Sequence, residues 1–267
     1  MIQDTFYSLK PYRPHEPGLN DIIFSFQNKQ VLVRKDRSFF EYRDICDSVH
    51  CTYLFETGSL SFYLADLSSI DHICLSLQQL RTYEPRWLGF AAILAWQLYT
   101  WIDANQYCGH DGKLMHMDMQ ERALRCDACN RLIYPTLSPA VIVGVIHNGR
   151  ILVTRYSAQH SSYSHDALVA GYAEAGETIE ETVKREVKEE TGLDVSDIVY
   201  YRSQPWPFSS SLLFGFFCHV SGSSQIHLDR NELKTAEWKS RTDAIDTADD
   251  SSLTHEMIEV FQKGLVH

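Results

Sequence analysis

Three glutamates are candidate catalytic groups, because Glu186, Glu189 and Glu190 recur at helical spacing. On a helix, residues at i, i+3 and i+4 share one patch, where each pair of like charges costs roughly a few tenths of a kcal/mol. Converging carboxylates offer oxygen-only ligands, which suit Mg²⁺ or Mn²⁺ together with waters and substrate phosphates. The spacing therefore predicts a site for a hard dication that repays the repulsion.

The surrounding residues predict the helix that positions these carboxylates. Thr178 followed by Glu181 has the spacing of a capping box, and Gly192 stands where a left-handed C-terminal cap belongs. The helix is therefore expected to run roughly over residues 178–191. Before it, residues 167–170 read as a short strand, and Gly171 and Gly176 allow a tight loop that brings backbone close to a phosphate.

The apolar positions of this helix indicate which glutamates approach the core. They form one stripe, and Glu186 and Glu190 project at its edge, where a carboxylate without a partner is costly. A bound metal would supply that partner. A solvated acidic face is the ordinary reading of an arbitrary Glu-rich helix. The stripe consists of Ile179, Val183 and Val187.

The order of the fixed residues argues against that ordinary reading. They match the Nudix box at every fixed position, so the chain resembles the Nudix hydrolase superfamily. The resemblance implies a helix-bound dication that activates water against a nucleoside diphosphate linked to another moiety. It gives Glu186, Glu189 and Glu190 the ligand positions and makes Glu177 and Arg185 a supporting ion pair. The fixed positions are Gly171, Glu177, Arg185, Glu186, Val187, Glu189, Glu190, Gly192 and Leu193.

The composition indicates a globular chain and argues against several classes of function. With 267 residues, of which 44% are hydrophobic, it can form two modest domains with substantial cores. The formal charge of −11 argues against broad nucleic-acid binding, which is driven by Lys and Arg. The first residues lack the order of a signal peptide, and seven dispersed cysteines do not suggest a disulfide framework. We therefore expect a cytoplasmic location.

The N-terminal part contains no catalytic pattern. Short β-rich runs alternate with polar breaks from Asp21 to about Ser69, which favours a meandering antiparallel sheet. Pro85 fits a first helical turn, and the aromatic segment that follows, residues 86–105, predicts a buried or interface helix. Polar residues interrupt its apolar run, so it is too short to span a membrane.

A cysteine cluster follows this helix and resembles a zinc ribbon with one defect. Cys126 and Cys129 form an intact C-x-x-C knuckle, whereas the position three after Cys108 is Asp111. If Zn²⁺ is bound, the three cysteines are ligands, and Asp111, His110 or His116 supplies the fourth. Because oxygen is a poorer ligand than thiolate at such a site, affinity is expected to be weaker than for four thiolates. Alternatively, packing or hydrogen bonds to Asp111 replace the metal, or the cysteines are there by chance.

The catalytic sheet is predicted to begin after the ribbon. Residues 139–147 and 150–156 flank Asn148-Gly149, a strong hairpin signal. Residues 197–201 and 212–220 read as further strands. Between them, residues 203–208 (SQPWPF) are too proline-rich for an ordinary strand interior, so we expect a rigid aromatic loop suited to holding a planar base.

The SQPWPF segment, the cysteines and the Nudix box together resemble the NADH pyrophosphatase subfamily, from about Tyr107 to the C-terminus. The resemblance makes Glu232 an additional metal-binding carboxylate. Two positions depart from it, with Ser209 in place of a proline and Thr254 in place of an alanine. The residues it places near substrate are Glu121, Tyr134, the Ala170 backbone, Tyr172, Gln204, Pro205, Trp206, Pro207, Phe208, Ser209, Ser210, Ser211 and Thr254.

These observations predict an α+β chain with three parts. A β-rich N-terminal domain ending in the aromatic helix covers residues 1–105, a zinc-ribbon-like segment covers 106–136, and a Nudix α/β/α sandwich covers 137–267. The aromatic helix and the resemblance together predict a homodimer, with core packing of that helix as the alternative.

The resemblance implies metal-dependent hydrolysis of the pyrophosphate of NADH or NAD⁺ to nicotinamide mononucleotide and AMP. Glu186, Glu190 and Glu232 are the expected principal ligands, and Glu189 is a ligand or the general base. The enzymatic alternative is a Nudix hydrolase for ADP-ribose, dinucleoside polyphosphates or NAD-capped RNA. The non-enzymatic alternative is a zinc-ribbon adaptor with a vestigial Nudix domain, which the acidic charge and the complete set of carboxylates oppose.

Overall fold

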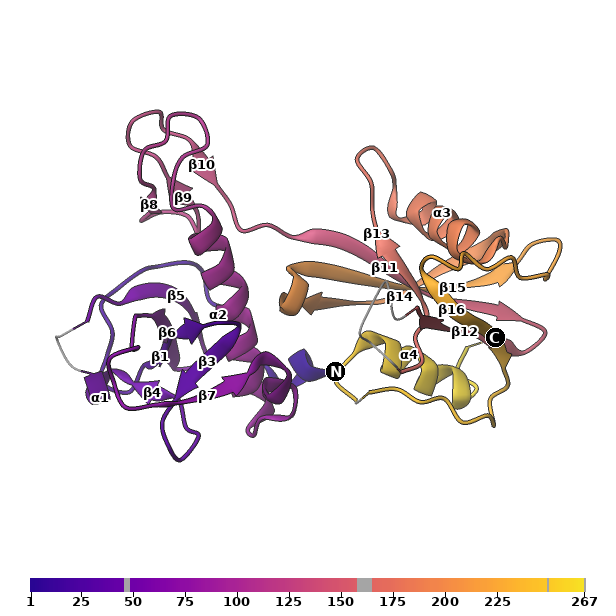
Figure 1. Cartoon of the computed structure of the whole chain (residues 1–267), viewed down its shortest axis with the longest axis horizontal. Coiled ribbons are helices and arrows are strands. Elements are labelled where there is room, and N and C mark those ends of the chain that lie inside the picture. The colour runs from indigo at the N-terminus through magenta and orange to yellow at the C-terminus, as the bar shows by residue number, and fades with distance from the viewer. Residues whose placement is uncertain (46–48, 158–164, 249, 267) are drawn as a thin grey trace. The chain divides into compact units, whose positions relative to one another are not determined.

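The computed structural model describes residues 1–45, 49–157, 165–248 and 250–266 and divides into two compact units. The N-terminal unit comprises residues 2–136 with 207–210, and the C-terminal unit comprises Met1 with residues 137–206 and 211–267. Figure 1 colours the first mainly indigo to magenta and the second mainly orange to yellow.

Two small sheets form the first part of the N-terminal unit. The first has the order β4-β1-β6-β5 and the second the order β2-β3-β7. The predicted antiparallel meander is wrong at one pairing, because β1 runs parallel to β6. All three residues of β1 are buried, as is typical of parallel strands. The strands are β1 (Ile22–Phe24), β2 (Phe26–Gln27), β3 (Gln30–Val33), β4 (Phe40–Glu41), β5 (Thr52–Thr57), β6 (Leu60–Leu64) and β7 (Ile73–Ser76).

Helix α2 (Arg86–Ala104) supplies much of this unit's core, together with the short helices η1 (Ile2–Thr5), α1 (Tyr42–Ile45) and η3 (Leu77–Thr82). The predicted helix is confirmed, with Pro85 as its N-cap residue rather than in its first turn. Phe90, Ile93 and Trp101 are buried on it. In the described part of the chain, no helix is long and apolar enough to cross a membrane.

The cysteine-bearing segment forms a three-stranded antiparallel sheet of β8 (His116–Met117), β9 (Leu124–Arg125) and β10 (Leu132–Ile133). Cys108, Cys126 and Leu124 belong to the same hydrophobic cluster as Trp101 of α2, so this sheet shares the core of the N-terminal unit.

The C-terminal unit contains a six-stranded mixed sheet in the order β14-β15-β11-β12-β16, with β13 also paired to β11. At its centre β11 and β15 run parallel, and Asn148 and Gly149 both have positive φ in the tight turn that joins β11 to β12. The predicted hairpin is therefore confirmed. The strands are β11 (Ser138–His147), β12 (Arg150–Tyr156), β13 (Val169–Tyr172), β14 (Val195–Trp206), β15 (Ser211–Val220) and β16 (Leu233–Lys239).

Two helices cover opposite faces of this sheet (Figure 1). Val183 and Val187 of α3 (Ile179–Thr191) pack in a cluster with Val141 and Val143, whereas α4 (Leu253–Gln262) packs against the alternate residue Ile142. Because successive strand residues point to opposite faces, both sides of β11 are buried. The predicted α/β/α sandwich and the α+β class are confirmed.

The interpretation of residues 203–208 as a loop is wrong. Strand β14 continues through Trp206, with Pro205 opposite Leu212 of β15, and only Pro207–Ser209 turn as the short helix η4. Strand β14 lies at the edge of the sheet, where a residue without an N–H is tolerated because only one side of the strand is paired.

Candidate functional site

Helix α3 is capped at both ends as the sequence predicts. The Thr178 hydroxyl accepts from the Glu181 amide at 3.2 Å, and Glu181 Oε2 accepts from the Thr178 amide at 2.8 Å. At the other end Gly192 adopts the left-handed conformation with φ 73°. The two caps fix where the glutamates of α3 lie along the helix.

Gly171 of β13 allows α3 to approach the sheet closely. A Cβ atom at this position would lie 1.9 Å from the Glu186 carboxyl carbon. Any larger residue would therefore displace the Glu186 carboxylate, and this explains the glycine physically. The predicted short strand is found slightly later in the chain than expected, as β13 over Val169–Tyr172.

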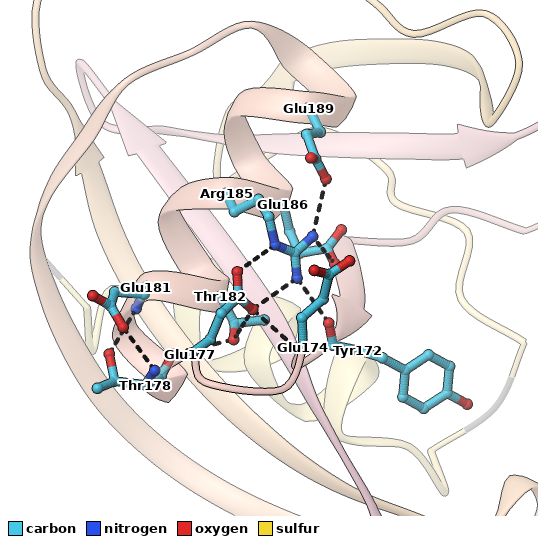
Figure 2. Close-up of polar contacts among 9 residues, drawn as sticks. All are labelled: Tyr172, Glu174, Glu177, Thr178, Glu181, Thr182, Arg185, Glu186 and Glu189. Atoms are coloured by element: carbon cyan, nitrogen blue, oxygen red, sulfur yellow. Dashed lines mark hydrogen bonds and ion pairs between the residues drawn. The ribbon is translucent and has the colours of Figure 1, made fainter.

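Arg185 links the loop before α3 to two of the candidate glutamates (Figure 2). Its Nε donates to Glu177 Oε1 at 2.6 Å, and its Nη2 donates to Glu177 Oε2 at 3.0 Å and to the Tyr172 carbonyl at 2.8 Å. Its Nη1 donates to Glu186 Oε1 at 2.7 Å and to Glu189 Oε2 at 2.9 Å. The guanidinium thus holds strand, loop and helix together.

The hydrogen bonds of this network favour the charged forms of both Glu177 and Arg185. Hydrogen bonds from Arg185 and from the Glu174 amide lower the pKa of Glu177 to about 2, and the Glu177 bond raises the pKa of Arg185. Thr182 Oγ1 also donates to Glu177 Oε2, at 2.9 Å. The pair is therefore a fixed structural ion pair near neutral pH.

Glu190 is the most unusual group of the site. It is 2% exposed, and neither carboxyl oxygen has a hydrogen-bond partner among the described residues. Burial, and then the nearby Glu186, Glu232 and Asp229, raise the pKa of Glu190 to about 8. The Ala170 amide offsets part of this shift without reaching hydrogen-bonding geometry. A buried carboxyl without a partner is costly, so this position favours a bound cation.

The other carboxylates approach Glu190 from two segments. Burial raises the pKa of Glu186, and the bond from Arg185 offsets part of that shift. Glu232, just before β16, acts electrostatically on both Glu186 and Glu190. Among the described residues, these carboxylate oxygens do not lie within 4.8 Å of one another as a ready-made group. The donors are all carboxylate oxygens, which fit Mg²⁺ or Mn²⁺.

A comparison with protein families decides what this arrangement is. The family model described as NUDIX domain matches residues 136–261. These residues are a Nudix domain. The predicted resemblance to the Nudix superfamily is thereby confirmed.

Curated relatives named NAD-capped RNA hydrolase NudC match more than half of this chain. The one from Vibrio atlanticus is 36% identical over 154 residues, which cover 58% of this chain and 56% of the relative. Those from Klebsiella pneumoniae and Stutzerimonas stutzeri are 36% and 39% identical, over 61% of this chain and 62% and 56% of the relative. The predicted subfamily resemblance agrees with these names.

The matches leave much of each protein uncompared, since the chain spans between about half and three fifths of these relatives' own length. A solved structure described as a Nudix hydrolase from Nitrosomonas europaea covers 59% of this chain and 91% of that chain, with a TM-score of 0.49 and 15% identity.

Outside the Nudix domain, the cysteine cluster is assembled as a possible metal site. One ligand atom from each of Cys108, Asp111, Cys126 and Cys129 lies within 4.8 Å of the others. Sγ of Cys126 lies 3.4 Å from Asp111 Oδ2, and the Cys108 and Cys129 sulfurs are 3.6 Å apart. His116 is not in this group and instead lies 3.4 Å from Asp127.

The two knuckles have the same backbone geometry despite the Asp111 replacement. The Gly112 amide donates to the Cys108 carbonyl, and the Asn130 amide donates to the Cys126 carbonyl, both at 2.8 Å. Gly112 and Asn130 both have positive φ. A first knuckle built like the second keeps the position of Asp111 equivalent to that of Cys129.

Some of the residues expected near substrate lie in the C-terminal unit. Tyr172 is 52% exposed, and its hydroxyl lies 3.2 Å from Ser211 Oγ. Gln204 is fully buried, donates to the Ser251 carbonyl and accepts from the Leu253 amide at 2.6 Å. Gln204 therefore fixes the start of α4. Pro205 and Trp206 end β14, and Thr254 lies in the first turn of α4.

The remaining expected substrate residues lie in the N-terminal unit. The Tyr134 hydroxyl donates to Glu121 Oε2 at 2.5 Å, and both side chains are exposed. Phe208 packs on the hydrophobic cluster of this unit, with the Arg81 guanidinium 5.9 Å from its ring centre. Pro207 is buried beside it, followed by Ser209 and Ser210.

Sequence reasoning missed Asp229 as a member of the acidic group. Its amide donates to the Glu190 carbonyl at 3.0 Å, and its carboxylate contributes to the raised pKa of Glu190. The signal was its place three residues before Glu232 in the same acidic segment.

Proposed function

We propose that this protein hydrolyses the pyrophosphate bond of NADH or NAD⁺ with Mg²⁺ or Mn²⁺, giving nicotinamide mononucleotide and AMP. The observation that carries the proposal is the buried carboxyl of Glu190, which lacks a hydrogen-bond partner among the described residues. Glu186, Glu232 and Asp229 add negative charge around it. The match to a Nudix domain and relatives named NAD-capped RNA hydrolase support the same activity.

Each residue of the site has a distinct proposed task. Glu186, Glu190 and Glu232 would hold the dication, which when bound neutralises the diphosphate and acidifies water. Arg185 orients Glu186 and is itself fixed by its two hydrogen bonds to Glu177. The Glu189 side chain is 60% exposed, so it is accessible either as a ligand or as the general base.

Substrate choice is the part of the proposal with the most alternatives. NAD-capped RNA shares the scissile group, and the names of the relatives favour it as a second substrate. ADP-ribose and dinucleoside polyphosphates share it as well. We propose that Trp206 and Phe208 shape the platform for the base, supported by the proline on each side of Trp206 that stiffens this segment.

Rates on a substrate panel test the proposal. Purified protein with Mg²⁺ or Mn²⁺ is expected to release nicotinamide mononucleotide and AMP from NADH or NAD⁺, measured by chromatography. A preference of about tenfold or more for ADP-ribose over NADH, which corresponds to ~1.4 kcal/mol in the barrier, would overturn the subfamily assignment. Equal or faster decapping of NAD-capped RNA would make RNA the preferred substrate while leaving the chemistry unchanged.

We further propose that the cysteine cluster binds a structural Zn²⁺ through Cys108, Asp111, Cys126 and Cys129. Four ligand atoms already lie within 4.8 Å of one another, which suits a closed tetrahedral site. Hydrogen bonding between Cys126 and Asp111 remains the metal-free alternative. A zinc content below about a tenth of an equivalent, in protein purified without chelator, would favour that alternative.

Three further expectations remain proposals. The division into residues 1–105, 106–136 and 137–267 is one of them. A homodimer is another, supported by partly exposed Trp87 and Trp96 on α2, and a monomer mass by light scattering would reject it.

A cytoplasmic location is the third, supported by the free thiols of the six cysteines among the described residues.

A further inference from the structure

The N-terminal unit contains a pocket that the proposed hydrolysis does not use. It has a volume of about 590 Å³ and lies where the C-terminal end of α2 meets the ends of β2 and β6. This volume falls in the range of sites for small organic molecules. We call it the N-terminal pocket.

One wall of the N-terminal pocket is apolar and aromatic. The rings of Phe26 and Tyr99 lie 5.3 Å apart with an interplanar angle of 31°, and Leu32 and Leu64 also line the pocket. Phe26 is buried, whereas Tyr99 is partly exposed. Such a wall suits an aliphatic chain, and a tyrosine face attracts a cation.

The polar side of the pocket is acidic. Asp66 and Asp103 line it, and its lining contains neither Lys nor Arg. Among the described residues, no ion pair involves either carboxylate. Asp66 accepts from the Ser68 amide at 3.0 Å, and Asp103 accepts from Gln106 Nε2 at 2.8 Å. After burial, Asp103 and then Asp66 contribute to the raised pKa of Tyr99, so both carboxylates act on the same end of the pocket.

Helix α2 adds to this negative charge. Its C-terminal end carries the negative pole of the helix dipole, where Lys or Arg is the stabilising choice. The last turn of α2 contains no basic residue and instead holds Asp103. The N-terminal pocket therefore combines an apolar wall, formed by Phe26 and Tyr99, with two carboxylates that form no ion pair among the described residues.

The spacing of the acidic groups argues against a bare metal ion. His50 also lines the pocket, yet His50, Asp66 and Asp103 do not place their ligand atoms within 4.8 Å of one another. These three side chains therefore cannot enclose one dication, because a dication needs several oxygen ligands at short distance. They can pair with separate charges on a larger molecule.

We propose that the N-terminal pocket binds an organic cation that carries ammonium or guanidinium groups on an aliphatic chain. The chain lies against Phe26 and Tyr99, and the cationic groups pair with Asp66 and Asp103. The site is distinct from the proposed hydrolytic site, because none of its lining residues is among the proposed substrate or metal-binding residues.

Calorimetric titration of the full chain with agmatine, which bears one guanidinium and one ammonium group, tests this proposal. The D66N/D103N variant is expected to bind agmatine about tenfold more weakly, since the ion pairs with two exposed carboxylates are lost. The asparagine oxygens can still accept the bonds from Ser68 and Gln106, so the fold is kept. The matched control D71N/E84Q removes the same charge from carboxylates that pair with Lys35 and Arg86, and it is expected to bind like wild type.

Any of four results would overturn the proposal. One is no heat of binding from wild-type protein at millimolar agmatine in low salt. Another is an equal loss of affinity in the pocket variant and the control, which would indicate non-specific charge attraction. The third is affinity for a neutral diol of the same chain length that matches the affinity for agmatine. Saturable binding of Mn²⁺ that is lost in D66N/D103N, without agmatine binding, would make the pocket a metal site instead.

Discussion

The cysteine cluster and the carboxylates of α3 are organised in opposite ways. In the cysteine cluster, four ligand atoms already lie within 4.8 Å of one another. On α3, the carboxylates are kept apart, and the Arg185 guanidinium lies between Glu186 and Glu189. The first arrangement suits a permanent structural ion, and the second suits a metal that arrives with or before the substrate.

The difference follows from what holds each group in place. Two backbone turns with positive φ at Gly112 and Asn130 fix the cysteine ligands. Side chains on one helix, one loop and one separate segment supply the carboxylates, and Glu190 is buried with no hydrogen-bond partner among the described residues. A preorganised cluster gains stability from its metal, whereas a buried carboxyl without a partner leaves a ligand position open for a metal that takes part in chemistry.

The largest expected effect is on catalysis by Glu190. The E190Q variant should lose at least about 100-fold in kcat on NADH, because a direct ligand matters more than an outer-shell residue, whose loss costs roughly 10–100-fold. Its thermal stability without metal should not fall, since glutamine has nearly the same size and cannot become charged when buried. The control E180Q changes an exposed residue in the first turn of the same helix and should keep nearly full activity. Activity of E190Q within threefold of wild type, ~0.7 kcal/mol, would remove Glu190 from the site.

The next largest effect is expected from replacing Arg185, which positions Glu186 and Glu189. The R185K variant keeps the positive charge but cannot make both bonds to Glu177 together with those to Glu186 and Glu189. We expect kcat on NADH to fall roughly 10–100-fold. The affinity for Mn²⁺, measured by electron paramagnetic resonance, should weaken as well. A change in thermal stability without any change in Mn²⁺ affinity would leave Arg185 with a purely structural role.

A smaller effect is expected from completing the cysteine cluster. The D111C variant places a fourth thiolate opposite Cys126, and zinc affinity in a chelator competition should rise by about tenfold or more. D111A should lower it, and NADH hydrolysis should change little in the folded D111C protein. Equal zinc affinities for wild type, D111C and D111A would show that Asp111 is not a ligand.

The smallest effect concerns acid stability. Bonds from Arg125 and from the Gln120 and Glu121 amides lower the pKa of Asp118 to about 2, below its unfolded value of 3.8. A depressed folded pKa gives stability that is present above the unfolded pKa and is lost as pH falls from about 4 to about 2. The difference in melting temperature between wild type and D118N should therefore shrink over that range. A difference that stays constant with pH would contradict this assignment.

The local features of this protein were predictable from sequence. The caps at Thr178 and Gly192, the burial of Glu186 and Glu190, and the hairpin at Asn148-Gly149 all depend on residues close together in the chain. These interactions repeat the same geometry wherever their residues recur. For that reason the Nudix helix and its glutamates were identified without a structure.

The features that sequence reasoning missed depend on distant partners. The parallel pairing of β1 with β6 and the continuation of β14 through Pro205 are decided by neighbouring strands. The bonds of Gln204 to Ser251 and Leu253, nearly fifty residues away, were not predicted either. The residues of one short segment do not reveal which distant strand or side chain that segment will contact.

Hydrolysis of NADH after removal and return of metal tests the central claim most directly. Protein treated with EDTA, dialysed and assayed with and without added Mn²⁺ is compared with the E189Q/E190Q double variant under the same conditions. Without Mn²⁺, we expect neither protein to release nicotinamide mononucleotide and AMP. When Mn²⁺ is returned, the wild type should recover full hydrolysis, whereas the double variant should recover none. Near-normal turnover in the double variant, or metal-independent turnover in wild type, would contradict the central claim.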